Sequence, residues 1–208
     1  MARRHIAVTG DGSVLRTPDT AVVSAAVSVR DRKLDGARDR ANARASEILA
    51  ALRTIGVPDA DVQAPSLQAH PTYDHARGTR LSGYEATRPF SIRVRDLSQL
   101  GAIFDALVDD GPTQVHGTTM ELAEPDGAAQ EALAAAVAHA RGRAEALATA
   151  AGVTLGAPLR IEEEGDGMPA PFAMRAMKAE MAADSVPTEV APGEIEISAR
   201  VRVWFSLE

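Results

Sequence analysis

The chain has 208 residues and 45% of them are hydrophobic, which predicts a globular protein with a core and not a disordered chain. Its net charge of -7 and its 3% of aromatic residues argue against a nucleic-acid-binding surface, which needs clustered cations and stacking rings. The absence of cysteine excludes disulfides, cysteine-ligated zinc and thiol catalysis.

No stretch of the sequence reaches the roughly 18 to 20 apolar residues that a transmembrane helix needs. The N-terminal segment contains Arg3 and Arg4, but no apolar run follows them. It therefore matches neither a secretory nor a twin-arginine signal. The sequence predicts a soluble cytoplasmic protein without a transmembrane segment.

The chain begins with a weakly alternating stretch, residues 5–9, that runs into Gly10-Asp11-Gly12. Two glycines around an aspartate predict a hairpin turn. A phosphate-binding loop is the alternative, but the dinucleotide fingerprint needs a third glycine where Leu15 stands, with a helix after it. The small and β-branched residues of 20–30 predict a strand.

The first long helix is predicted over 34–55 and ends at Gly56. Its apolar positions recur at helical spacing: Ala37, Ala41, Ala45, Ile48, Leu52 and Ile55. A strand over 61–69, a polar hairpin arm and a strand over 84–94 follow. Pro89 inside the last strand predicts an edge position or a bulge, because proline cannot donate to the ladder.

A shorter helix over 97–108 and a strand over 113–122 lead to the longest predicted helix, 126–151. Asp126 and Gly152 have the residue types that begin and end helices. Its apolar stripe is Leu133, Val137, Ala140, Ala144, Leu147 and Ala151. Since this stripe is mostly alanine, we expect the helix to lie very close to the sheet it covers.

The C-terminal part begins with a strand over 155–163 and a long segment rich in Pro, Met and Ala. The last strand, 194–207, alternates almost without fault, which is typical of a half-buried antiparallel strand. The residues expected on its inner face are Ile195, Ile197, Ala199, Val201, Val203 and Phe205.

The element order repeats, which predicts an α+β fold built by a tandem β-α-β-β duplication. In a single domain covering residues 1–208, the repeat halves are expected at about 20–95 and 113–207. Their long arms are expected at 70–83 and 165–193. The fold expected is a mostly antiparallel sheet with long helices packed on one face.

Four stretches carry a resemblance to a known family: IAVTGDGSVLRTPDTAVVSAAVSV, GYEATRPFSIRVRDLSQLGAIFDALVDDG, ARGRAEALATAAGVTLG and APGEIEISARVRVWFSL. In order and spacing they resemble the SIMPL-domain family of bacterial proteins. This family includes periplasmic immunogenic proteins and proteins named for oxidative-stress defence. The resemblance implies an α+β domain and, in some relatives, assembly into multi-subunit rings.

The resemblance implies no established enzymatic activity and no catalytic residue to carry over. Most bacterial relatives begin with an export signal, whereas here the domain starts at once. Because most of the family is exported, the periplasm or cell envelope is the alternative to the cytoplasmic location expected from this sequence.

Two histidines, His70 and His75, lie close together in HPTYDH with Tyr73 and Asp74. Imidazoles and a carboxylate are common ligands of divalent metals, so this segment is a candidate metal site. The spacing matches no standard metal-binding pattern, and a solvated arm tip is the simpler interpretation.

Three methionines, Met174, Met177 and Met181, share one helical face at spacings of three and four. Methionine adapts to irregular surfaces, so this face is a candidate contact for a partner or another subunit. The alternatives are packing on its own domain, disorder, or Cu(I) binding through thioethers.

The acidic run Glu162, Glu163, Glu164 and Asp166 predicts a solvated surface and not acid–base chemistry. No catalytic constellation and no cofactor site emerge from the sequence. The function it favours is a non-enzymatic homo-oligomeric scaffold or interaction protein, linked to envelope or stress functions. The alternative is a small-ligand or metal-binding protein, and nothing in the sequence supports a hydrolase.

Overall fold

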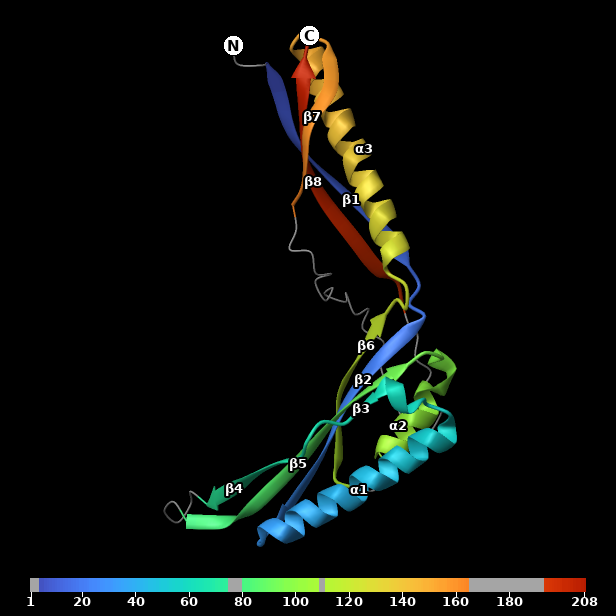
Figure 1. Cartoon of the computed structure of the whole chain (residues 1–208), viewed down its shortest axis with the longest axis vertical. Coiled ribbons are helices and arrows are strands. Elements are labelled where there is room, and N and C mark those ends of the chain that lie inside the picture. Colours follow the sequence, from blue (N-terminus) through green and yellow to red (C-terminus); the bar gives the residue numbers. More distant parts are fainter. Residues whose placement is uncertain (1–3, 75–79, 109–110, 165–192) are drawn as a thin grey trace, which may run out of the picture. The chain divides into compact units, whose positions relative to one another are not determined.

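The computed structural model describes residues 4–74, 80–108, 111–164 and 193–208 (Figure 1). The chain divides into two compact units. We call residues 19–123 the central unit, and residues 4–18, 124–164 and 193–208 the terminal unit. Helices and antiparallel sheets in both units confirm the predicted α+β class.

The terminal unit is a three-stranded antiparallel sheet in the order β1-β8-β7, with one long helix across it (Figure 1). Its elements are β1 (His5–Arg16), α3 (Asp126–Ala150), β7 (Leu155–Glu163) and β8 (Ile195–Leu207). The helix packs mainly on β1 and β8. As predicted, alternate residues of β8 face it, and Val201, Val203 and Phe205 are buried.

The helix α3 buries a stripe of alanines that recur at every fourth position: Ala128, Ala132, Ala136, Ala140, Ala144 and Ala148. The predicted stripe was wrong at two of its large residues, because the side chains of Val137 and Leu147 are 36% and 51% exposed. Only alanine is small enough where the backbones of helix and sheet come closest, so the larger residues lie beside the contact.

The predicted hairpin turn at Gly10-Asp11-Gly12 was wrong, because all three residues lie inside β1 and pair with β8. A Cβ atom added at Gly12 would lie 2.3 Å from the carbonyl oxygen of Ala132. Glycine is needed here because the helix backbone lies too close to the strand for a Cβ atom. A glycine inside a strand can thus indicate a close backbone approach and not a turn.

The central unit has a five-stranded antiparallel sheet, with β3-β5-β2-β6 in order and β4 also paired to β5. Its elements are β2 (Thr20–Asp31), α1 (Leu34–Ile55), β3 (Val62–Gln63), β4 (Gln68–Asp74), β5 (Arg80–Val94), α2 (Leu100–Val108) and β6 (Thr113–Glu121). Both helices lie on the same side of this sheet in Figure 1 and contribute to one core.

The helix α1 has the predicted bounds and buries five of its six predicted apolar positions. It ends at Gly56, which has a φ of +100°. This left-handed conformation costs glycine little, which is why the sequence signal for the helix end was reliable. The core that α1 covers includes Val23, Val27 and Ile92.

The strand β5 is paired with β4 along 80–87 and with β3 at 91–92. Pro89 falls between these two stretches, where no ladder bond is made on that side. The expectation of an edge position or a bulge therefore holds only locally, since β5 is an interior strand and Pro89 pairs with Ala26 of β2 without a bulge. The predicted strand 61–69 is broken, since only 62–63 and 68–69 of it are strand.

The two sheets share one strand order, β4-β5-β2 in the central unit and β7-β8-β1 in the terminal unit. The strand β6 pairs with β2 in the central unit, whereas β1 pairs with β8 in the terminal unit. The expected second half, 113–207, therefore differs from the terminal unit by exchanging β6 for β1. The duplication itself stays a prediction, which the matching strand orders support.

Candidate functional site

A hollow of about 480 Å³ lies at the side of the central sheet that α1 and α2 leave uncovered. Its lining residues come from β2, β3, β5, β6, the turn before β3 and the residue after β5: Val22, Ala60, Asp61, Gln63, Ser91, Arg93, Arg95 and Glu121. Two arginines and two carboxylates make this hollow polar and close to neutral in charge.

The central feature of this hollow is the ion pair between Asp61 and Arg95. Both carboxylate oxygens of Asp61 accept hydrogen bonds from Arg95, from Nε and from Nη2, at 2.7 Å each. The Asp61 side chain is only 5% exposed. The hydrogen bond and charge of Arg95 hold the pKa of Asp61 below its ordinary value. A carboxylate kept ionised in this way is suited to fixing the loop and not to donating a proton.

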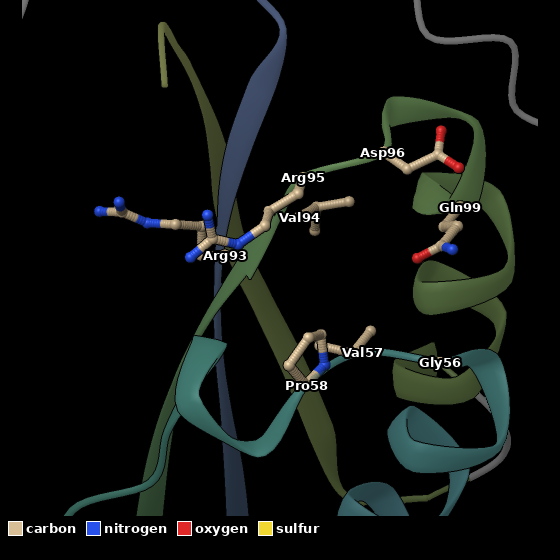
Figure 2. A pocket seen from close by; sticks show the side chains of 8 residues that line it. All are labelled: Gly56, Val57, Pro58, Arg93, Val94, Arg95, Asp96 and Gln99. Carbon is tan, nitrogen blue, oxygen red and sulfur yellow. The ribbon is translucent and has the colours of Figure 1, made fainter. Parts of the chain in front are cut away.

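A smaller hollow of about 190 Å³ adjoins the same end of β5 (Figure 2). It is lined by the end of α1, the end of β5 and the start of the next helical turn: Gly56, Val57, Pro58, Arg93, Val94, Arg95, Asp96 and Gln99. Its one carboxylate already has a structural role, because Asp96 Oδ1 accepts hydrogen bonds from the N–H and the hydroxyl of Ser98. The pKa of Asp96 is lowered by these bonds.

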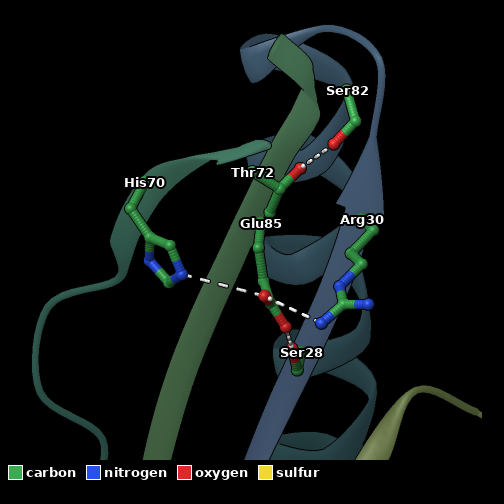
Figure 3. A network of polar contacts seen from close by, with 6 residues as sticks. All are labelled: Ser28, Arg30, His70, Thr72, Ser82 and Glu85. Atoms are coloured by element: carbon green, nitrogen blue, oxygen red, sulfur yellow. Dashed lines mark hydrogen bonds and ion pairs between the residues drawn. The ribbon is translucent and has the colours of Figure 1, made fainter. Parts of the chain in front are cut away.

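A network of polar side chains surrounds Glu85 of β5 (Figure 3). Ser28 Oγ donates to Glu85 at 2.7 Å and Arg30 Nη2 donates at 3.2 Å. His70 Nε2 lies 3.7 Å from the same carboxylate. The hydrogen bond from Ser28, followed by that from Arg30, lowers the pKa of Glu85. Three strands are thus joined by one carboxylate.

The predicted site residues are placed as follows. His70 lies on β4 and pairs with Glu85, while His75, Met174, Met177 and Met181 fall outside the described residues. Within the described ranges, no group of three or more His, Asp and Glu side chains is arranged to hold a metal ion. The candidate metal site at His70 and His75 therefore stays a prediction.

Three residues of the acidic run, Glu162, Glu163 and Glu164, lie at the end of β7, and Asp166 falls outside the described residues. Glu162 pairs with Arg160, and Glu164 pairs with Arg202. All four of these side chains are at least 40% exposed, in agreement with the solvated surface expected there. The chain's one tryptophan, Trp204, lies between the same two arginines. Its ring centre is 5.1 Å from the Arg160 guanidinium carbon and 5.2 Å from that of Arg202.

Sequence reasoning missed the Asp61–Arg95 pair and the arginines that flank Trp204. The first joins residues 34 positions apart, for which the sequence carries no local signal. The contact between Arg202 and Trp204 did have a local signal. The two residues stand two positions apart in the predicted last strand, which places them on the same outer face. No helix of the described residues is long and apolar enough to cross a membrane.

The family comparison matches residues 6–205 to SIMPL, described as a protein of unknown function (DUF541). The chain belongs to the SIMPL family. A relative from Brucella melitensis, the 26 kDa periplasmic immunogenic protein, is 31% identical, with 98% of this chain and 85% of that protein covered.

Two further relatives carry the name uncharacterized protein YggE. The one from Escherichia coli K12 is 27% identical, with 98% of this chain and 83% of that protein covered. The one from Edwardsiella ictaluri is 26% identical over 73% of this chain and 64% of that protein. The SIMPL family is thus established for this chain, and its relatives carry no enzyme names.

Proposed function

We propose that this SIMPL protein is a non-enzymatic oligomeric scaffold or interaction protein. The observation that carries the proposal is the hairpin of β4 and β5, where Tyr73 and Leu81 stand opposite each other across the ladder. Each of these side chains is 48% exposed. Opposed apolar side chains on an exposed hairpin offer a surface that a second protein can cover.

The partners of three carboxylates, two in the hollows and one in the Glu85 network, support the non-enzymatic part of the proposal. Asp61 is bound by Arg95, Asp96 by Ser98, and Glu85 by Ser28 and Arg30. Each of these carboxylates has its pKa lowered by its partners, so none is poised to exchange protons near neutral pH.

We propose the periplasm or cell envelope as the location, with an envelope or stress-related role. The name of the Brucella relative, which calls that protein periplasmic, supports this location over a cytoplasmic one. Fractionation of the source bacterium, with an antibody against this chain, tests it. Recovery with cytoplasmic markers would overturn the location.

Native mass spectrometry of the untagged protein at micromolar concentration tests the scaffold function. We expect a discrete assembly of several subunits, which Leu81→Ser weakens. The matched control is Leu147→Ser, which removes a similarly exposed leucine from the surface of α3. A wild-type protein that stays a monomer would contradict the proposal, and a bound metal in the mass would favour a metal-binding protein instead.

A further inference from the structure

The sheet of the terminal unit has two edges that differ in their access to a further strand. At the β1 edge, side chains of α3 occupy the outward backbone groups. The N–H of Asp11 donates to His139 Nδ1 at 3.1 Å, and Arg143 Nη1 donates to the carbonyl oxygen of Thr9 at 2.7 Å. These contacts block a strand from approaching β1.

The other edge, formed by β7, has no such cover among the described residues. There β7 pairs only with β8 and lies at the border of the sheet (Figure 1). The N–H of Glu164 donates to the carbonyl oxygen of Arg200 on β8 at 2.8 Å. Because backbone groups alternate in direction along an antiparallel strand, those of Ile161 and Glu163 point away from β8.

This open edge carries apolar side chains. Ile161 is 53% exposed although its ladder partner Val203 is fully buried, and Leu159 is 44% exposed. Unpaired backbone groups beside exposed aliphatic side chains are a template for pairing with another strand. Such an edge is stable in solution when a partner covers it.

The charges on β7 indicate which partner fits. Ile161 is flanked by Arg160 and Glu162, which form an ion pair within one strand. A two-fold axis through Ile161 would place Arg160 of each copy opposite Glu162 of the other. The same axis makes Ile161 face itself in a hydrogen-bonded pair, as the outward direction of its N–H and C=O requires.

We propose that β7 pairs antiparallel with β7 of a second copy of this chain, with the two-fold axis at Ile161. The pairing joins two three-stranded sheets into one continuous sheet. It rests on the proposed scaffold function and names one of its subunit contacts. The strand is self-complementary in charge and in hydrogen bonding, so the contact closes with two-fold symmetry.

Charge reversal tests this pairing directly. Arg160→Glu and Glu162→Arg each place like charges opposite each other in the paired strands, so we expect each to raise the dissociation constant of the contact about tenfold. In an equal mixture of the two variants, a chain with two acidic residues at 160 and 162 can pair with a chain with two basic ones. Opposite charges then face each other across the axis, although each chain still carries like charges at these two positions. Native mass spectrometry with one variant labelled with ¹⁵N should therefore detect mixed pairs.

An intramolecular role alone predicts the opposite result. Each chain in the mixture keeps its own like-charged pair, so mixing would then restore nothing. Absence of mixed pairs, or single variants that associate as well as the wild type, would overturn the β7 pairing. If the β7 pairing fails but the wild type still forms an assembly, the proposed scaffold function is retained. If the wild type is a monomer, both proposals are overturned.

A cysteine variant gives a second readout that does not depend on charge. The chain has no cysteine, so Ile161→Cys introduces one unique thiol. Hydrogen-bonded antiparallel partners have Cα atoms about 5.5 Å apart, within the range of a disulfide. We expect a covalent dimer on mild oxidation, and none for the control Leu147→Cys. Failure of Ile161→Cys to cross-link would contradict the proposal.

Discussion

A Cβ atom added at Gly10 would lie 2.1 Å from the carbonyl oxygen of Ala136, and 2.5 Å from the nitrogen of Ala140. The strand β1 and the helix α3 are therefore in backbone contact at this point. Glycine on the strand and alanine on the helix form one complementary pair of surfaces. Neither surface can grow by a methyl group unless the two elements separate.

We predict that Gly10→Ala destabilises the protein by about 1–3 kcal/mol, because the added methyl group meets helix backbone that cannot rotate away. Trp204 fluorescence during urea unfolding measures the change, since the chain's one tryptophan lies on β8 of the same sheet. An unchanged midpoint would contradict the close contact between β1 and α3.

The matched control for Gly10→Ala is Gly142→Ala, in the middle of α3. An added Cβ there meets no atom within 4 Å. Alanine restricts the unfolded chain and favours the helix, so we predict that this substitution stabilises the protein by about 0.5–1 kcal/mol. The urea midpoint should therefore fall for Gly10→Ala and rise for Gly142→Ala. A loss of stability for Gly142→Ala would contradict the open space around Gly142.

The fold could be predicted where the signal is local. The bounds of α1 follow from its spacing of apolar residues and from Gly56, whose left-handed conformation the sequence suggests. The burial of α3 could not be predicted, because a helix so rich in alanine offers several equivalent stripes. The glycines of β1 favour the stripe that contains Ala132, Ala136 and Ala140, and they lie more than 100 residues away in the chain.

The polar contacts could not be predicted for a related reason. Asp61 and Arg95 meet because β3 and β5 are neighbours in the sheet, and Glu85 meets Ser28 because β5 and β2 are. The sequence predicted these strands but not which strands are adjacent. The pairing of β6 with β2 is a further adjacency for which the sequence carries no signal.

We predict that Asp61→Asn destabilises the protein by about 1–3 kcal/mol at pH 7, because the buried side chain of residue 61 loses its charge and one of its two acceptors for Arg95. Urea unfolding followed by circular dichroism measures this. The control is Asp59→Asn, which removes an exposed pair with Arg53 and should cost under about 1 kcal/mol. Equal effects of the two substitutions would contradict a structural role for the Asp61–Arg95 pair.

The same pair predicts a pH dependence. Folding lowers the pKa of Asp61 below its ordinary value of 3.8, so its stabilisation is full above that value. The stabilisation is lost as the pH falls through 3.8 toward the lower pKa of the folded state. The difference in stability between wild type and Asp61→Asn should therefore shrink below about pH 4. If the stability difference between the two proteins stays constant down to pH 3, the ionised carboxylate of Asp61 is not the source of the stabilisation.

The Glu85 network predicts a ranking between substitutions at two of the residues that contact Glu85. Ser28→Ala removes a 2.7 Å hydrogen bond to a carboxylate whose side chain is 19% exposed, so we expect a loss of about 1–3 kcal/mol. His70→Ala removes a contact of 3.7 Å from a mostly exposed ring and should change stability by no more than about 0.5 kcal/mol. Urea unfolding at pH 7 compares the two. A larger loss for His70→Ala would mean that the histidine has a role beyond this contact, and zinc titration of the wild type and of His70→Ala would then be the next experiment.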